Sequence, residues 1–265
     1  MLKTRLIPVL LLKNGLLVRS ETFSVHQIIG NPIHEVQRFN AWSVDELVYL
    51  DISRSDDYDQ RRSDHKVRDL DDPLKILDAV SETCFMPLTW GGRIRSLDDM
   101  RERLRRGADK IVINSEAVRN PDLVTQAARA FGAQAVVVSI DVREFEDGFH
   151  RVFIDGGTHD TGLRATEWAE RVGALGAGEI LLQSIDRDGA GHGYDTDLIR
   201  AVIEATDIPV IACSGVGMYE HYAAGVAAGA SAVAAANIFH FKELSDRGGK
   251  RALARAGVEV RLPLK

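Results

Sequence analysis

The feature that most constrains the fold of this chain is a regular alternation of short apolar runs with longer amphipathic segments. The runs are too short for helices and are typical of strands that are buried on both faces. Strands that alternate with helices predict a parallel sheet. Helices are expected at residues 32–42, 121–131, 163–172 and 197–205, with a further one after Ser96 and a hairpin turn at Asp147-Gly148. Eight strands are expected, at residues 5–12, 46–52, 86–90, 110–114, 135–141, 180–182, 209–213 and 232–236.

The two halves of the chain also resemble each other. DELVYLDI (45–52) resembles GEILLQSI (178–185), and GADKIVINS (107–115) resembles GASAVAAAN (229–237). A duplicated half with four strand–helix units predicts a (β/α)8 barrel, which would form one domain over residues 1–265. An open doubly wound sheet is the alternative fold.

Composition narrows the class of protein. A net charge of −6 and a pI near 5.8 argue against nucleic acid or an anionic membrane as the main partner. The two cysteines, Cys84 and Cys213, lie beside expected strands and indicate reduced thiols in a cytoplasmic protein. No metal-ligand spacing is visible among cysteines and histidines, so neither a metal nor another cofactor is expected.

Two segments need a separate interpretation. The apolar run at residues 6–12 has no signal-peptide cleavage site. The charge-rich stretch at 54–72 is expected to be a solvated loop, with a lid as the alternative.

Glycines and small polar residues follow the expected strands at equivalent places in the two halves. Gly92 and Asn114-Ser115 match Gly215 and Ala236-Asn237, and a loop with Asp188 and Gly189 follows the sixth strand. Ligands bind at the carboxyl ends of barrel strands, and free N–H groups at such turns bind oxyanions. The pairing predicts two facing phosphate sites, whereas any single glycine could simply serve a tight turn.

Asp141 ends the fifth expected strand, where its carboxylate would enter the barrel mouth as a general acid or base. A structural aspartate bonded to loop N–H groups is the alternative. The first strand occupies the equivalent place in the other half and reads Leu10, Leu11, Leu12, so it offers no carboxylate.

Four charged residues begin alternate strands at the opposite end of the expected barrel. Alternate strands share a layer of a barrel interior, so two positive and two negative side chains there would form a ring of ion pairs. Such a ring stabilises the barrel, and a ring that can part would also gate a small neutral molecule. The four residues are Arg5, Glu46, Lys110 and Glu179.

Taken together, these residues resemble a known family over essentially the whole chain: the cyclase subunit of imidazole glycerol phosphate synthase, from histidine biosynthesis. The resemblance implies a (β/α)8 barrel paired with a glutaminase subunit, which docks on the bottom face and sends ammonia through the barrel to a ribulosyl bisphosphate substrate. It implies that the charged ring is the ammonia gate, that Asp141 is one of two catalytic aspartates, and that the glycine and polar sites named above, Asp188 and Gly189 included, bind the phosphates. The sequences that carry the resemblance are DELVYLDI, GADKIVIN, QAVVVSID, GEILLQSIDRDG, GYDTDLIR and IFHF, in this order.

The chain departs from the family at the barrel mouth. Leu11 stands where the family has its other catalytic aspartate, and loss of an essential acid or base commonly lowers a rate by ~10² to 10⁴. Arg93, Ser214 and Asn237 also differ from the family's usual residues.

These departures favour a paralogue that takes ammonia from a glutaminase and passes it on. The acceptor would be a separate ATP-dependent amidotransferase that modifies a sugar for surface polysaccharide. The alternatives are a genuine cyclase in which Asp51 or Asp186 replaces the missing acid, and a sugar-phosphate enzyme unconnected to ammonia. Neither cysteine has the histidine context of a glutaminase nucleophile, so glutamine hydrolysis is assigned to the partner.

Overall fold

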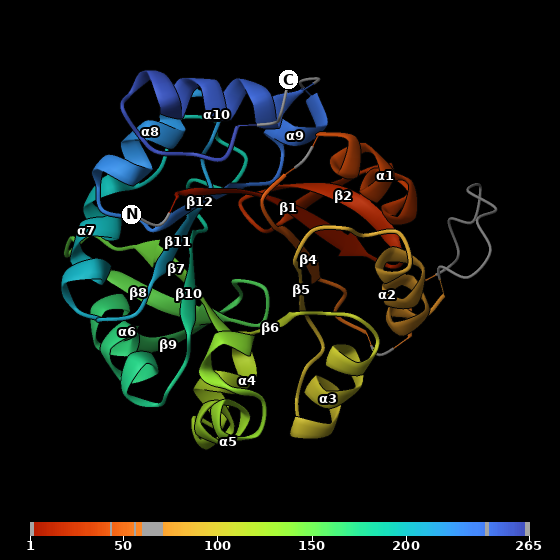
Figure 1. The fold of residues 1–265 in the computed structure, drawn as a ribbon. Helices are drawn as coiled ribbons and strands as arrows, with labels where there is room; N and C mark the ends of the chain where they lie inside the picture. Colours follow the sequence, from red (N-terminus) through yellow and green to blue (C-terminus); the bar gives the residue numbers. More distant parts are fainter. Residues whose placement is uncertain (1–2, 43, 56, 60–70, 242–243, 263–265) are drawn as a thin grey trace.

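A computed structural model describes residues 3–42, 44–55, 57–59, 71–241 and 244–262. Among them, eight parallel strands close into a barrel, because β10 pairs with both β7 and β11. The predicted (β/α)8 barrel is therefore confirmed, and the open sheet is excluded (Figure 1). Most of the charge-rich stretch considered as a lid lies outside the described residues. In order around the barrel, the strands are β1 (Arg5–Lys13), β4 (Leu47–Asp51), β5 (Leu88–Gly91), β6 (Lys110–Ile113), β7 (Val136–Glu144), β10 (Glu179–Ser184), β11 (Val210–Cys213) and β12 (Ala232–Ala235).

Helices surround the barrel (Figure 1). Two of them begin at side-chain caps. Ser96, which the sequence predicts as a cap, accepts a hydrogen bond from the Asp99 amide. The sequence offers Asp195 or Thr196 as the cap of α7, and in the structure Asp195 accepts the Leu198 amide. No helix in the described part of the chain is long and apolar enough to cross a membrane. The helices are α1 (Pro32–Trp42), α2 (Pro73–Ser81), α3 (Leu97–Arg105), α4 (Ser115–Arg119), α5 (Asp122–Phe131), η1 (Ala133–Ala135), α6 (Ala165–Ala174), α7 (Thr196–Glu204), α8 (Glu220–Ala227), α9 (Ile238–Phe241) and α10 (Ser245–Arg255).

Two antiparallel excursions extend the sheet beyond the barrel. The hairpin predicted at Asp147-Gly148 joins β7 to β8 (His150–Ile154), and β9 (His159–Arg164) adds a third strand that delays the start of α6 to Ala165. The strands expected from the sequence include none between residues 12 and 32, but the structure has a hairpin there, formed by β2 (Leu16–Glu21) and β3 (Val25–Gly30). Asn14 and Gly15 both have positive φ at its turn, as an Asn-Gly hairpin turn requires.

The apolar core has two layers, and β1 shows how one strand serves both. Leu6, Leu10 and Leu12 pack outward against the helices, whereas alternate residues of the same strand point into the barrel. The apolar part of the barrel interior is mainly aliphatic, and Thr89, Ser139 and Gln183 add buried polar groups above and below it. The aliphatic residues include Ile7, Val9, Leu11, Val48, Leu50, Val112, Val137, Leu181, Ile211, Ala232 and Ala234.

Candidate active site and charged ring

A cavity of about 500 Å³ opens at the carboxyl ends of the barrel strands. Residues from both halves of the chain line it, so the structure brings together every residue that the sequence predicts for the mouth. These residues are Leu11, Gly92, Asn114, Ser115, Asp141, Asp188, Gly189, Gly215, Ala236 and Asn237.

Asp141 is the central carboxylate of this cavity, and its side chain is held in place by two neighbours. Its Oδ1 accepts hydrogen bonds from Ser139 Oγ at 2.8 Å and from Gln183 Nε2 at 3.0 Å. Ser139 lies two residues earlier on β7, and Gln183 is the partner of Asp141 in the β7–β10 register. Burial raises the pKa of Asp141 to about 6, although both hydrogen bonds favour the ionised form. Asp141 can therefore gain or lose a proton near neutral pH.

Leu11 lines the same cavity from β1 and is 7% exposed. It packs in the apolar interior with Val9, Val18 and Leu50. Its side chain carries no hydrogen-bonding group, so this side of the mouth is a methyl surface.

Gly92 and Gly215 form matching close turns in the two halves. Their φ angles are +96° and +91°. A Cβ atom on Gly92 would lie 2.1 Å from the carbonyl oxygen of Asp51, and one on Gly215 would lie 2.2 Å from that of Gly193. Both positions therefore require glycine, which supports the duplication seen in the sequence.

Asp188 and Asn237 both hold the β2–β3 hairpin. Asp188 Oδ2 accepts hydrogen bonds from Ser20 Oγ at 2.6 Å and from the Phe23 amide at 3.1 Å. Asn237 Nδ2 donates to the Ser20 carbonyl at 2.8 Å, and its Oδ1 accepts from the Ser20 amide at 3.3 Å. Burial raises the pKa of Asp188. These two side chains thus fix the wall of the cavity, a role that sequence reasoning missed together with the hairpin.

In the other half, Asn114 and Ser115 also have partners. Asn114 Nδ2 donates to the Ser139 carbonyl at 3.0 Å, and Ser115 Oγ accepts a hydrogen bond from the Asp155 amide at 3.0 Å. The helix α4 begins at Ser115, directly beside the cavity. Both residues therefore position the backbone around the mouth.

Arg93 brings a cationic group to the turn after Gly92. Its guanidinium lies 3.7 Å from Asp51 Oδ2 and 5.2 Å from the centre of the Tyr58 ring, and Tyr58 donates a hydrogen bond to Asp51 at 2.9 Å. Burial raises the pKa of Asp51.

Asp51 lines the cavity, but Asp186 is exposed and lies outside its lining, so the structure contradicts Asp186 as a replacement acid.

Basic side chains from several loops surround the cavity. They offer cationic partners to an anionic ligand, but the acidic side chains of Asp51, Glu116, Asp141, Asp155 and Asp188 line the same cavity. His26, beside Lys13, stays neutral at physiological pH, since burial and the Lys13 charge lower its pKa to about 4. The basic lining residues are Lys13, Arg54, Arg93, Arg95 and Arg119.

At the opposite end of the barrel, the four predicted charges form a closed ring. Lys110 Nζ lies 3.2 Å from Glu46 Oε1 and 2.7 Å from Glu179 Oε2. Arg5 completes the ring with ion pairs to both glutamates, at 2.5 Å to Glu46 Oε2. Thr89 Oγ1 adds a hydrogen bond to Glu46 at 2.8 Å.

The ring separates solvent from the aliphatic barrel interior. Glu46 is 2% exposed and precedes β4, while Arg5, Lys110 and Glu179 each begin a strand. Burial alone would raise the pKa of Glu179, but the charges and hydrogen bonds of Arg5 and Lys110 outweigh burial and lower it. The ion pairs thus favour the charged form of Glu179, and the attraction between the two glutamates and their cationic partners closes this end of the barrel.

Comparison with known proteins shows the family to which the chain belongs. The family model described as histidine biosynthesis protein matches residues 5–245. The chain is 44% identical over 264 residues to the imidazole glycerol phosphate synthase subunit HisF of Gluconacetobacter diazotrophicus, which covers 98% of this chain and 97% of that relative. The subunit of the same name from Caulobacter vibrioides is 45% identical over 264 residues, covering 99% and 97%. The one from Natranaerobius thermophilus is 42% identical over 263 residues, covering 99% and 100%.

Proposed function

Because the chain belongs to the histidine biosynthesis protein family and is similar to cyclase subunits of imidazole glycerol phosphate synthase, we propose that it is the ammonia-accepting barrel of a glutamine amidotransferase complex. The observation that carries the proposal is the ring of Arg5, Glu46, Lys110 and Glu179 below an aliphatic interior that leads to the cavity. The whole chain serves this role as one barrel domain.

Ammonia is small and neutral, so an aliphatic interior would pass it while excluding ions, whose transfer from water is far more costly. Each glutamate is paired with both Arg5 and Lys110. The ring would open when one ion pair breaks, because the glutamate concerned keeps its other cationic partner. In this proposal the glutaminase subunit docks on the face that carries the ring.

The chain's own thiols support the assignment of glutamine hydrolysis to a partner. Burial raises the pKa of Cys213 to about 12, and burial also raises that of Cys84. A thiol attacks as its thiolate, so both cysteines are held in the unreactive form.

Two fates of the ammonia follow from two different observations. The names of the relatives favour a genuine cyclase, which would join ammonia to a ribulosyl bisphosphate in the cavity. Leu11 favours a conduit that passes ammonia to a separate ATP-dependent amidotransferase acting on a sugar, because only Asp141 is left for acid–base work at the positions of the two family aspartates. We adopt the conduit as the primary proposal and the cyclase as its competitor.

Turnover of the purified chain separates the two. The assay supplies the bisphosphate substrate and excess ammonium at alkaline pH, where free ammonia forms and no glutaminase is needed. The conduit predicts a silent wild type, with activity gained in Leu11→Asp and lost again when Asp141→Asn is added. Wild-type turnover at an ordinary enzymatic rate would instead establish the cyclase.

A further inference from the structure

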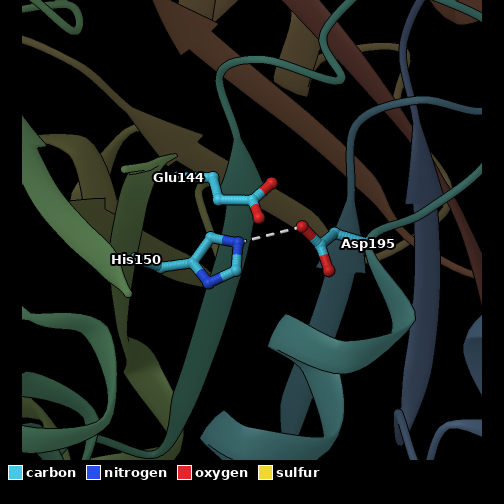
Figure 2. Close-up of side chains that lie close together, drawn as sticks. All are labelled: Glu144, His150 and Asp195. Atoms are coloured by element: carbon cyan, nitrogen blue, oxygen red, sulfur yellow. Dashed lines mark hydrogen bonds and ion pairs between the residues drawn. The ribbon is translucent and has the colours of Figure 1, made fainter. Parts of the chain in front are cut away.

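Three potential metal ligands converge outside the cavity, on the β7–β8 hairpin and the loop before α7. Glu144 is the last residue of β7, His150 is the first of β8, and Asp195 caps α7. Each residue offers one ligand atom: a carboxylate oxygen from Glu144, another from Asp195, and a ring nitrogen from His150. These three atoms lie within 4.8 Å of one another. Figure 2 shows the three side chains pointing toward a common space.

The backbone explains why these side chains meet. Glu144 and His150 are directly opposite each other in the antiparallel β7–β8 register, so their side chains share one face of the hairpin. Asp195 approaches that face from the end of a different barrel loop, and its Oδ2 lies 2.9 Å from His150 Nε2. Its Oδ1 accepts the Leu198 amide at 3.0 Å, which fixes the orientation of the carboxylate.

Negative charge is in excess around this imidazole. Asp186 accepts the Glu144 amide at 3.0 Å, so a third carboxylate lies beside the cluster. Within the described ranges, neither Glu144 nor Asp186 forms an ion pair with a cationic side chain within 4.0 Å, and the only such partner of Asp195 is His150. With a neutral imidazole, a divalent cation balances the charge of the two carboxylate ligands.

We propose that Glu144, His150 and Asp195 form a binding site for a divalent transition-metal ion of the Zn²⁺ class. Zn²⁺ takes imidazole nitrogen and carboxylate oxygen at about 2.0–2.2 Å, which places neighbouring ligand atoms about 3.4 Å apart in a tetrahedron. His150 and Asp195 need to open slightly to reach this spacing. The exposed Glu144 has the rotamer freedom to close on the ion, and solvent supplies the fourth ligand.

The site is separate from the proposed ammonia route, because none of its three ligands lines the cavity. Its effect would be mechanical. A bound ion links the β7–β8 hairpin to the loop between β10 and α7, and that loop carries Asp188 and Gly189 into the cavity wall. The sequence gives no hint of this site, because its ligands have no recognised metal-binding spacing.

Zinc binding by the full chain tests the proposal. Chelator-treated wild type is titrated with Zn²⁺ against a chromophoric competitor, and the thermal midpoint is recorded with and without Zn²⁺. We expect one bound equivalent and a raised midpoint, since a ligand bound only by the folded state stabilises it. We expect His150→Gln to weaken binding at least tenfold, and His159→Gln, an exposed histidine on β9 outside the cluster, to leave it unchanged.

Asp195→Asn guards against a trivial loss of folding. Asparagine caps a helix as well as aspartate does, so this variant keeps α7 but removes a charged ligand. We expect it to unfold like the metal-free wild type and to bind Zn²⁺ more weakly. The proposal is overturned if wild type binds no Zn²⁺ at millimolar concentration, or if His150→Gln and wild type bind it equally.

Discussion

Leu11 and Asp141 line one cavity from opposite sides of the barrel, since β1 and β7 are separated by three strands in either direction. They stand at corresponding places in the two halves of the chain, one as a methyl surface and the other as a carboxylate held by Ser139 and Gln183. The mouth is thus asymmetric in chemistry although its backbone is duplicated. This asymmetry is the reason to test the cyclase activity of the chain directly.

Asp141 lowers stability at neutral pH. Burial raises its pKa from 3.8 to about 6, so the folded chain retains a proton between pH 4 and 6 that the unfolded chain releases. This contribution is fully present below about pH 4 and is lost as the pH rises through 6, about 3 kcal/mol in all. The side-chain oxygen of Asp141→Asn still accepts hydrogen bonds from Ser139 and Gln183. We expect this variant to have a larger free energy of unfolding in urea than wild type at pH 7, but not at pH 4. An equal difference at both pH values would contradict this.

A buried ion pair fixes α10 to the barrel. Lys250 is fully buried and lies 2.9 Å from Asp45, which also accepts the Leu6 amide. Lys250→Met leaves the Asp45 carboxylate without its countercharge, and we expect a loss of about 3–5 kcal/mol in the free energy of unfolding. Arg255→Met on the same helix removes only an exposed pair with Glu220 and should change it by less than ~1 kcal/mol. Similar losses in the two variants would show that the buried pair has no special role.

Gly92 is required by the geometry of the mouth. Gly92→Ala places a Cβ 2.1 Å from the Asp51 carbonyl oxygen, so the backbone must shift. Gly148→Ala is the matched control, because φ is also positive there, at +77°, but a Cβ meets open space. We expect Gly148→Ala to lower the free energy of unfolding by about 1–2 kcal/mol, and Gly92→Ala to lower it clearly more. Thermal unfolding compares them, and equal losses would refute the steric argument.

The charged ring contributes to stability as well as to the proposed gate. Glu46 accepts from Arg5, Lys110 and Thr89, and Glu46→Gln removes its charge with little change in shape. We expect a loss of about 2 kcal/mol, less than for a fully buried pair, because Arg5 and Lys110 are partly exposed. Asp98→Asn, which affects an exposed pair with Arg101, should stay within ~0.5 kcal/mol in the same urea titration. A loss no larger than in this control would indicate that solvent already screens the ring.

The β2–β3 hairpin was missed although its turn is visible in the sequence. Asn14-Gly15 is a strong hairpin signal, and Leu16, Leu17 and Val18 continue the apolar pattern of a strand. Local sequence signals are therefore sufficient to predict this hairpin. By contrast, the sequence identifies Ser96 as a cap and narrows the cap of α7 to Asp195 or Thr196, because a cap depends only on the next three residues. The structure selects Asp195.

The amino-acid sequence by itself determined the barrel and the set of residues at its mouth. The periodicity of apolar residues and the positions where strands end are local properties of the sequence. In a parallel barrel the carboxyl ends of all strands lie at the same face. Only the tertiary structure decided which side chains meet there. Three of these contacts depend on the register between strands or on the paths of loops. They are the hydrogen bonds from Gln183 to Asp141 and from Asn237 to Ser20, and the contact between His150 and Asp195. Packing of the whole core fixes these relationships, and no short stretch of sequence encodes them.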